Sequence, residues 1–151
     1  MKVVFMGTPD FAVGTLKELI DNQYDVVAVV TQPDKPKGRS KELVFSPVKE
    51  EAVKNNIQVL QPERARDEAF VEELRKYNAD VFVVVAFGQL LPKSIIDMPR
   101  LGCINVHASL LPKYRGASPI QWAVIDGCEY SGVTTMKMDA VSYTHLTLPT
   151  N

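Results

Sequence analysis

An unbroken apolar run from Val81 to Ala86 limits the folds that are open to this chain. Its residues do not alternate between apolar and polar, so a strand formed here would have both faces covered. Shorter runs of the same kind occur at Val3–Met6, Val26–Val30 and Cys103–Val106. Strands covered on both faces are typical of parallel sheets flanked by helices, which predicts an α/β fold.

Helical patterns separate these runs. Apolar residues gather on one helix face within Phe11–Ile20, and Asp67–Tyr77 repeats the pattern. Two more helices are predicted to begin at Ser46-Pro47 and Ser118-Pro119, because serine suits the cap and proline the first helical position. The second of these helices is expected to end at Gly127, a glycine placed to follow its last turn.

Short strands are also predicted at Val59–Leu60 and Val133–Met138. The alternation of strands and helices predicts a Rossmann-like, doubly wound and mostly parallel sheet. Ligands of such sheets bind outside the carboxyl ends of the strands. The positions just after the strands are therefore the first site candidates, namely those following Met6, Val30, Ala86 and Val106.

The turn after the first strand argues against a dinucleotide cofactor. A nicotinamide or flavin fold would carry several glycines here so that the backbone could approach a pyrophosphate. The segment Gly7–Phe11 has one glycine, and Pro9 removes a backbone donor. It is either a tight strand-to-helix turn or a ligand contact.

Net charge excludes a general attraction to nucleic acid. The 151 residues suit one domain, and 17 basic residues against 18 acidic ones give a formal net charge of -1. A nucleic-acid partner would need a local basic patch. Thr31–Lys41 fits neither a strand nor a helix pattern and concentrates cations. From charge alone it is either a phosphate-binding patch or a solvated loop; its cations are Lys35, Lys37, Arg39 and Lys41.

Cysteine and histidine spacing predicts no metal site. Cys103 and Cys128 have neither Cys-x-x-Cys spacing nor histidine neighbours at ligand spacing, so we expect free thiols in a reducing compartment. No apolar stretch approaches the roughly 20 residues of a membrane span. We expect a cytoplasmic protein.

Asn105-Val106-His107 is the strongest chemical pattern. Residues two apart in a strand point to the same face, so an amide and an imidazole would meet one ligand together. Asparagine can donate to an oxyanion during acyl transfer, and histidine can act as general acid or base. By itself the triplet favours a structural histidine over a catalytic one.

The run continues from Asn105 to Pro119 as N-V-H-A-S-L-L-P-K-Y-R-G-A-S-P, which resembles the signature of the folate-dependent formyltransferases. The resemblance implies formyl transfer from 10-formyltetrahydrofolate to an amine, with Asn105 and His107 as catalytic residues. It implies folate contacts from two segments. These are Phe87, Gly88, Gln89 and Leu90 in one, and Ser109, Leu110, Leu111 and Pro112 in the other.

Two further segments resemble the tRNA-directed branch of this family, Gly7–Ala12 and Thr31–Arg39. That branch implies initiator methionyl-tRNA as partner, a role in translation initiation, and a monomer. The implied tRNA contacts are Lys35, Lys37, Arg39 and Lys41. The alternatives are a formyltransferase for an amino sugar or glycinamide ribonucleotide, a non-catalytic folate-binding fragment, and a plain nucleotide-binding module.

The resemblance stops near residue 140. Residues 1–140 are expected to form an incomplete catalytic domain, and Tyr143 stands where the family has its third catalytic residue, an aspartate. We interpret Val141–Asn151 as a foreign tail that resembles a translated sequencing adaptor. The C-terminal tRNA-binding domain is expected to be absent and the chain as written inactive, with an exposed sheet edge that favours aggregation.

Overall fold

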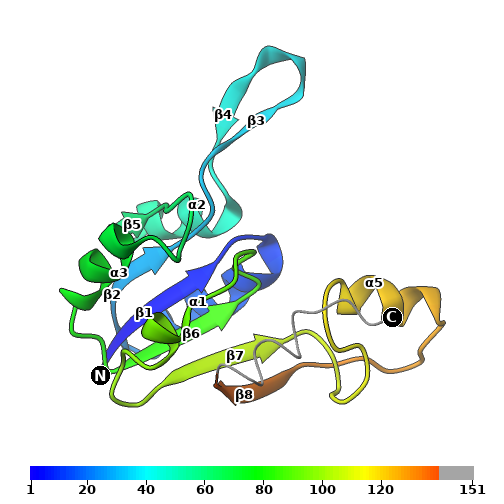
Figure 1. Cartoon of the computed structure of the whole chain (residues 1–151). Coiled ribbons are helices and arrows are strands. Elements are labelled where there is room, and N and C mark those ends of the chain that lie inside the picture. The colour runs from blue at the N-terminus through cyan, green and yellow to red at the C-terminus, as the bar shows by residue number, and fades with distance from the viewer. Residues whose placement is uncertain (140–151) are drawn as a thin grey trace.

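The computed structural model describes residues 1–139, which form a six-stranded sheet in the order β5-β2-β1-β6-β7-β8 (Figure 1). Pairs from β5 to β7 are parallel, and β8 runs antiparallel to β7 at the border. The predicted doubly wound sheet is therefore confirmed. Its strands are β1 (Lys2–Gly7), β2 (Asp25–Val30), β5 (Val59–Leu60), β6 (Val81–Val85), β7 (Cys103–His107) and β8 (Thr134–Met138).

Helices cover both faces of the sheet. On one face α1 (Asp10–Asp21) and α2 (Pro47–Lys54) pack against β1 and β6, with Leu16 fully buried. On the other face α3 (Glu68–Arg75) and the short α4 (Lys93–Ile96) complete a second core. β6 is buried at every position and contributes alternate side chains to the two cores, as its unbroken apolar run predicts.

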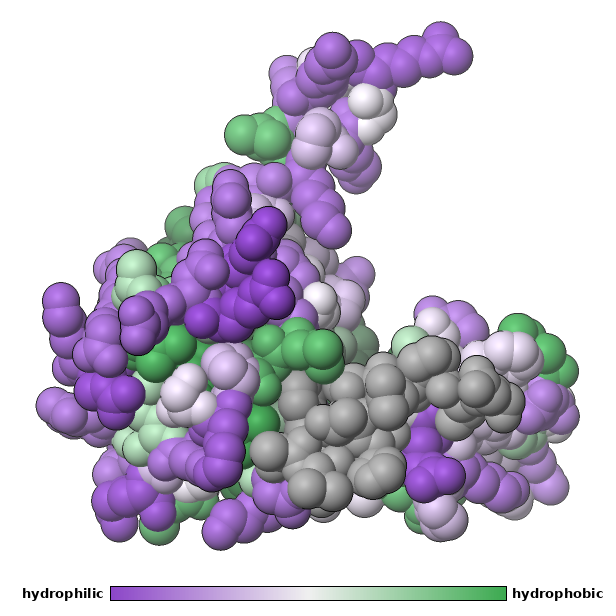
Figure 2. All heavy atoms as spheres, in the orientation of Figure 1, coloured by the Kyte–Doolittle hydropathy of each residue, from purple (hydrophilic) through white to green (hydrophobic). Residues whose placement is uncertain are grey.

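A hairpin projects from the body between β2 and α2. β3 (Lys35–Lys37) pairs antiparallel with β4 (Glu42–Val44), and the turn is the short 3₁₀ helix Gly38–Ser40. The sequence predicts no strands here, because both strands are exposed and carry no buried face to impose a period. Figure 2 shows the hairpin as a largely hydrophilic arm standing away from the body.

The two predicted helix starts differ in outcome. Ser46 caps α2 as predicted, its Oγ accepting a hydrogen bond from the Lys49 backbone N–H at 3.1 Å. Ser118 precedes α5 (Pro119–Ile125) but has a left-handed backbone, φ 61, and makes no side-chain cap bond. The cap prediction for Ser118 is therefore wrong, because the preceding turn fixes its backbone outside the extended region that a cap requires.

The end of α5 follows the prediction. Gly127 has φ 64, its N–H donates to the Val124 oxygen, and the Cys128 N–H donates to the Ala123 oxygen. This pair of bonds is a Schellman motif, which needs a left-handed residue at the glycine position.

Across residues 1–139, the helices are too short or too polar to span a membrane. The interpretation of Val141–Asn151 and the position of Tyr143 lie outside the described residues.

Candidate active site

A cavity of about 640 Å³ opens at the carboxyl ends of β6 and β7. A volume of this size falls in the range of small-molecule binding sites. Three of the four predicted strand ends, those of β1, β6 and β7, contribute to its wall. The lining segments are Pro9, Phe11, Ala86–Leu90, Asn105–Ala108 and Gly116–Gln121, with Val84 of β6.

Asn105 and His107 both lie on β7 and both line this cavity, as the spacing of the triplet predicts for one shared ligand. Asn105 is held from two sides, because its register partners are Val84 on β6 and Met136 on β8. Its side chain is half-buried and makes no hydrogen bond within the described part of the chain. The amide is therefore available to a ligand oxygen in the cavity.

His107 is 8% exposed, and its ring Nε2 lies 2.8 Å from the main-chain oxygen of Tyr114. A carbonyl oxygen only accepts, so Nε2 carries the hydrogen of this bond. In the neutral ring, Nδ1 is then the nitrogen with a lone pair. The contact thus leaves Nδ1 as the ring nitrogen that can accept a proton.

The loop after β6 is shaped by two left-handed residues, Ala86 with φ 49 and Gly88 with φ 91. The Thr8 hydroxyl donates to the Phe87 oxygen at 2.8 Å. The Gln89 side chain holds the next turn, because its Oε1 accepts from the Ala65 N–H at 2.8 Å and its Nε2 donates to the Pro62 oxygen at 2.9 Å. All four predicted folate contacts in this loop line the cavity: Phe87, Gly88, Gln89 and Leu90.

The second predicted folate segment lies elsewhere. Ser109 is buried, and its hydroxyl donates to the Lys113 oxygen at 2.6 Å. Leu110, Leu111 and Pro112 line a separate cavity of about 480 Å³ together with residues 128–131. Four of the eight predicted folate contacts thus line the first cavity, three line the second, and Ser109 lines neither. A folate contact by this second segment stays a prediction.

The predicted tRNA contacts all lie on the exposed hairpin. Lys35 and Lys37 are on β3, Arg39 is in the 3₁₀ turn, and Lys41 follows it with φ 55. None of the four lines the cavity at β6 and β7. The structure places these four cations on one projecting arm, and their contact with RNA stays a prediction.

Some residues that line the cavity are not predicted by the sequence. The segment Gly116–Gln121 forms one wall of the cavity, although the signature that contains it implies no ligand contact there. At the first turn, Gly7 lines neither cavity, and an added Cβ would lie 2.8 Å from the Val85 oxygen. Gly7 is therefore a packing requirement, whereas Pro9 and Phe11 beside it reach the cavity.

The end of β2 supplies a polar cluster in place of a cavity wall. Asp34 pairs with Lys49, and the hydrogen bond from Lys49 holds the pKa of the Asp34 carboxyl below its ordinary value.

No three histidine, cysteine or acidic side chains gather as a metal site in the portion of the chain that the structure covers. Cys103 and Cys128 are free, and burial raises the pKa of the Cys103 thiol to about 12.

The chain is similar to several known proteins. The family model described as "Formyl transferase" matches residues 1–142. A protein of Lachnospira eligens named methionyl-tRNA formyltransferase is 86% identical over 139 residues, covering 92% of this chain and 44% of that protein. A protein of the same name from Agathobacter rectalis is 66% identical, with 92% and 45% covered. The chain thus spans less than half the length of these curated relatives.

A solved structure shares the fold at low identity. The phosphoribosylglycinamide formyltransferase from Bacillus halodurans superposes with a TM-score of 0.70 and 18% identity. The match covers 92% of this chain and 72% of that one. At this identity the likeness concerns the sheet and its helices and does not extend to the substrate.

Proposed function

Because the chain belongs to the formyl transferase family, we propose that it is the leading part of an enzyme that formylates methionyl-tRNA. The observation that carries this proposal is the 86% identity to the Lachnospira eligens protein of that name. The formyl donor would be 10-formyltetrahydrofolate and the acceptor initiator methionyl-tRNA. A cytoplasmic location is part of the same proposal.

The cavity suits the flat ring system of a folate. Its wall combines apolar side chains such as Leu90 and Val106 with the tightly turned backbone at Gly88. Pockets of this kind bind ring systems through apolar contacts and a few fixed polar groups. When bound, the folate supplies the formyl group on its N10 nitrogen.

Asn105 is suited to charge stabilisation. The methionyl amine would attack the formyl carbon, so that negative charge develops on the formyl oxygen as the new carbon–nitrogen bond forms. The Asn105 amide, unengaged among residues 1–139 and lining the cavity, would donate to that oxygen. Its strand is paired on both sides, which keeps this donor in place before the reaction starts.

His107 is suited to proton transfer. The attacking amine must lose a proton, and N10 must gain one as the bond between N10 and the formyl carbon breaks. With Nε2 donating to Tyr114, the Nδ1 lone pair of His107 can accept the first proton and return it to N10. The proton that leaves the amine is therefore the one that N10 gains.

The test extends residues 1–139 with the downstream sequence of the Lachnospira eligens relative; we refer to this protein as the extended enzyme. Formylation of methionyl-tRNA from 10-formyltetrahydrofolate is measured for the extended enzyme and for the 151-residue chain. Activity in the extended enzyme alone would support the proposal and locate missing chemistry after residue 139. Transfer to an amino sugar or glycinamide ribonucleotide, with none to methionyl-tRNA, would overturn it.

A further inference from the structure

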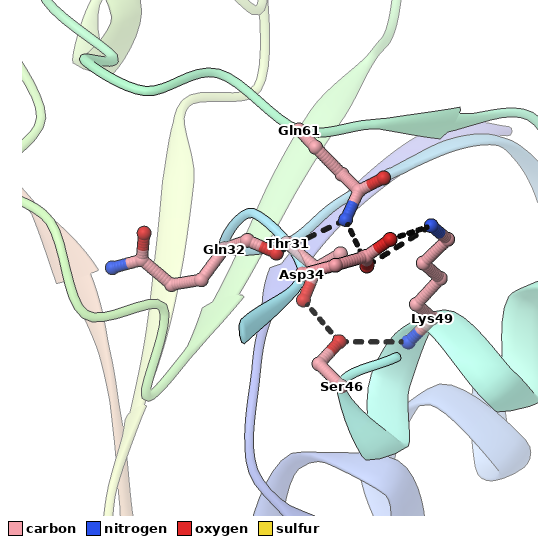
Figure 3. Close-up of polar contacts among 6 residues, drawn as sticks. All are labelled: Thr31, Gln32, Asp34, Ser46, Lys49 and Gln61. Carbon is pink, nitrogen blue, oxygen red and sulfur yellow. Dashed lines mark hydrogen bonds and ion pairs between the residues drawn. The ribbon is translucent and has the colours of Figure 1, made fainter. Parts of the chain in front are cut away.

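Three polar side chains, those of Asp34, Lys49 and Gln61, form a cluster at the base of the hairpin together with the main-chain oxygen of Gln32 (Figure 3). The Lys49 ammonium lies 2.8 and 3.0 Å from the two Asp34 carboxylate oxygens. The Gln61 amide donates to Asp34 at 2.7 Å and to the Gln32 main-chain oxygen at 3.2 Å. We call these residues the hairpin-base cluster.

The cluster fixes the direction in which the hairpin leaves the body. The Asp34 and Lys49 side chains are 20% and 13% exposed, so solvent screens their attraction less than at an open surface. The two chain segments of the stem are also tied to each other, because the Thr31 and Ser46 hydroxyls lie 2.6 Å apart (Figure 3). The Lys49 ammonium also lies 3.8 Å from the centre of the Phe45 ring. Phe45 directly follows β4.

Gln32 also contacts the loop that lines the cavity. Its side-chain Oε1 accepts a hydrogen bond from Gln89 Nε2 at 2.9 Å. Gly88 makes room for this contact, because a Cβ there would lie 2.8 Å from Gln32 Nε2. A parallel link runs through Thr8, whose hydroxyl lies 3.4 Å from the Gln32 backbone nitrogen and donates to the Phe87 oxygen.

Gln32 therefore belongs to two structural units at once. Its main-chain oxygen is held by the hairpin-base cluster, and its side chain is held by the cavity loop. Gln32 itself lines neither cavity, so its contacts serve neither ligand directly. Gln32 is therefore a direct hydrogen-bonded connection between the two units.

We propose that Gln32 is a positioning residue that couples RNA binding on the hairpin to folate binding in the cavity. This inference rests on the proposed function and adds cooperativity to it, because each substrate strengthens the binding of the other. Coupling between two sites is reciprocal, so the same factor applies in both directions. Gln32 holds the cavity loop when RNA restrains the hairpin, and holds the hairpin when folate restrains the loop.

The experiment uses the extended enzyme with two unreactive probes, tetrahydrofolate and an uncharged RNA acceptor-stem hairpin. Calorimetry gives the dissociation constant of tetrahydrofolate with and without saturating RNA. We expect RNA to tighten tetrahydrofolate at least about fivefold, the lower end of typical coupling between sites. In Gln32→Met, which keeps the length of the side chain but cannot accept from Gln89, the ratio should fall toward one, with the link through Thr8 left in place.

Two further variants separate coupling from folding. Gln32→Glu keeps an acceptor for Gln89 and should restore the ratio. Glu72→Gln removes a surface ion pair with Arg75 on α3, away from the cluster, and should leave the ratio unchanged. A ratio of one in the unmodified enzyme, or an unchanged ratio in Gln32→Met, would overturn the coupling. Failure of either probe to bind alone would instead overturn the proposed function.

Discussion

The His107 ring donates its Nε2 hydrogen to the main-chain oxygen of Tyr114 across 2.8 Å. The bond ties the end of β7 to the segment that leads toward α5, and thereby joins two walls of the cavity at β6 and β7. One ring nitrogen thus serves structure while the other remains available for chemistry. The two roles of His107 can therefore be separated by substitution.

His107→Gln should lower formyl transfer by the extended enzyme about 10²- to 10⁴-fold, the usual contribution of a general acid or base. Glutamine retains an amide that can donate to the Tyr114 oxygen but has no basic nitrogen, so the melting temperature should change little. Turnover and thermal melting are measured on the same preparation. Turnover close to that of the unmodified enzyme would contradict the proton-transfer role.

The hairpin cations should contribute separately to RNA affinity. Replacing Lys35, Lys37, Arg39 or Lys41 singly with glutamine should weaken acceptor-stem binding, and each should lower the salt slope by about one. Titrations at several salt concentrations give that slope. Lys17→Gln, an exposed cation on α1, is the matched control and should leave the slope unchanged. An equal effect from Lys17 would mean that the arm is not the RNA site.

Acid should release the hairpin-base cluster. The pKa of Asp34 is lowered in the folded protein, first by the hydrogen bond from Lys49 and then by that from Gln61. A lowered folded pKa adds stability above the unfolded value of about 3.9, and this stability is lost as pH falls through the folded pKa. The stability advantage of the unmodified chain over Asp34→Asn should therefore be constant from pH 7 to 5 and shrink below about pH 4.

Urea unfolding at each pH measures this difference. An advantage that stays constant down to pH 3 would show that the Asp34 carboxylate is not stabilised by its partners. Asp80→Asn is unsuitable as a control variant, because the pKa of Asp80 is also lowered, chiefly by the hydrogen bond from the backbone N–H of Lys2. Glu72→Gln, in an exposed pair, is the better reference.

The two thiols should differ in reactivity. Cys103 is fully buried, and its pKa of about 12 leaves roughly one thiolate in 10⁴ at pH 8. Cys128 is half-buried, with its sulfur 2.9 Å from the Tyr114 hydroxyl. A thiol reagent should label Cys128 in the native chain and Cys103 only after denaturation. Mass spectrometry of the labelled peptides distinguishes them, and native labelling of Cys103 would show that its core opens.

Gly7→Ala should destabilise the chain by about 1–3 kcal/mol, the usual cost of overpacking. The added Cβ would meet the Val85 oxygen at 2.8 Å and the Ala12 Cβ at 2.9 Å, both in packed elements that cannot move aside freely. Urea unfolding measures the change. Gly14→Ala is the control, since an added Cβ there meets nothing within 4 Å. Equal stability of the two variants would contradict the packing role of Gly7.

The sequence predicted the parts of this fold whose signal is local or strongly apolar. β6 and β7 were predicted because continuous apolar runs need cover on both faces. The β3–β4 hairpin was missed because its short strands pair only with each other and bury nothing. Ser118 misled the cap prediction because Ser-Pro is a local pattern, while the left-handed backbone at Ser118 is set by the turn before it.

The candidate site was likewise predicted where its signal is local and missed where it is not. That Asn105 and His107 would meet one cavity followed from their spacing on a strand, and the Phe87–Leu90 loop followed from the end of the neighbouring strand. The separate cavity at Leu110–Pro112 depends on how the chain folds back after β7, which no local pattern encodes. The contact between Gln32 and Gln89 joins residues far apart in the sequence and needs the finished sheet to bring them together.

Among residues 1–139, the hairpin joins the body through the two segments of its stem, and β7 lies in paired strands of the main sheet. Such an arm can change length or composition without disturbing the sheet, provided that its base is kept. Selection for a new acceptor molecule would then act on the arm while the reactive strand stays as it is. An engineer could exchange the arm between relatives in the same way, retargeting one reaction by transplanting residues 35–44.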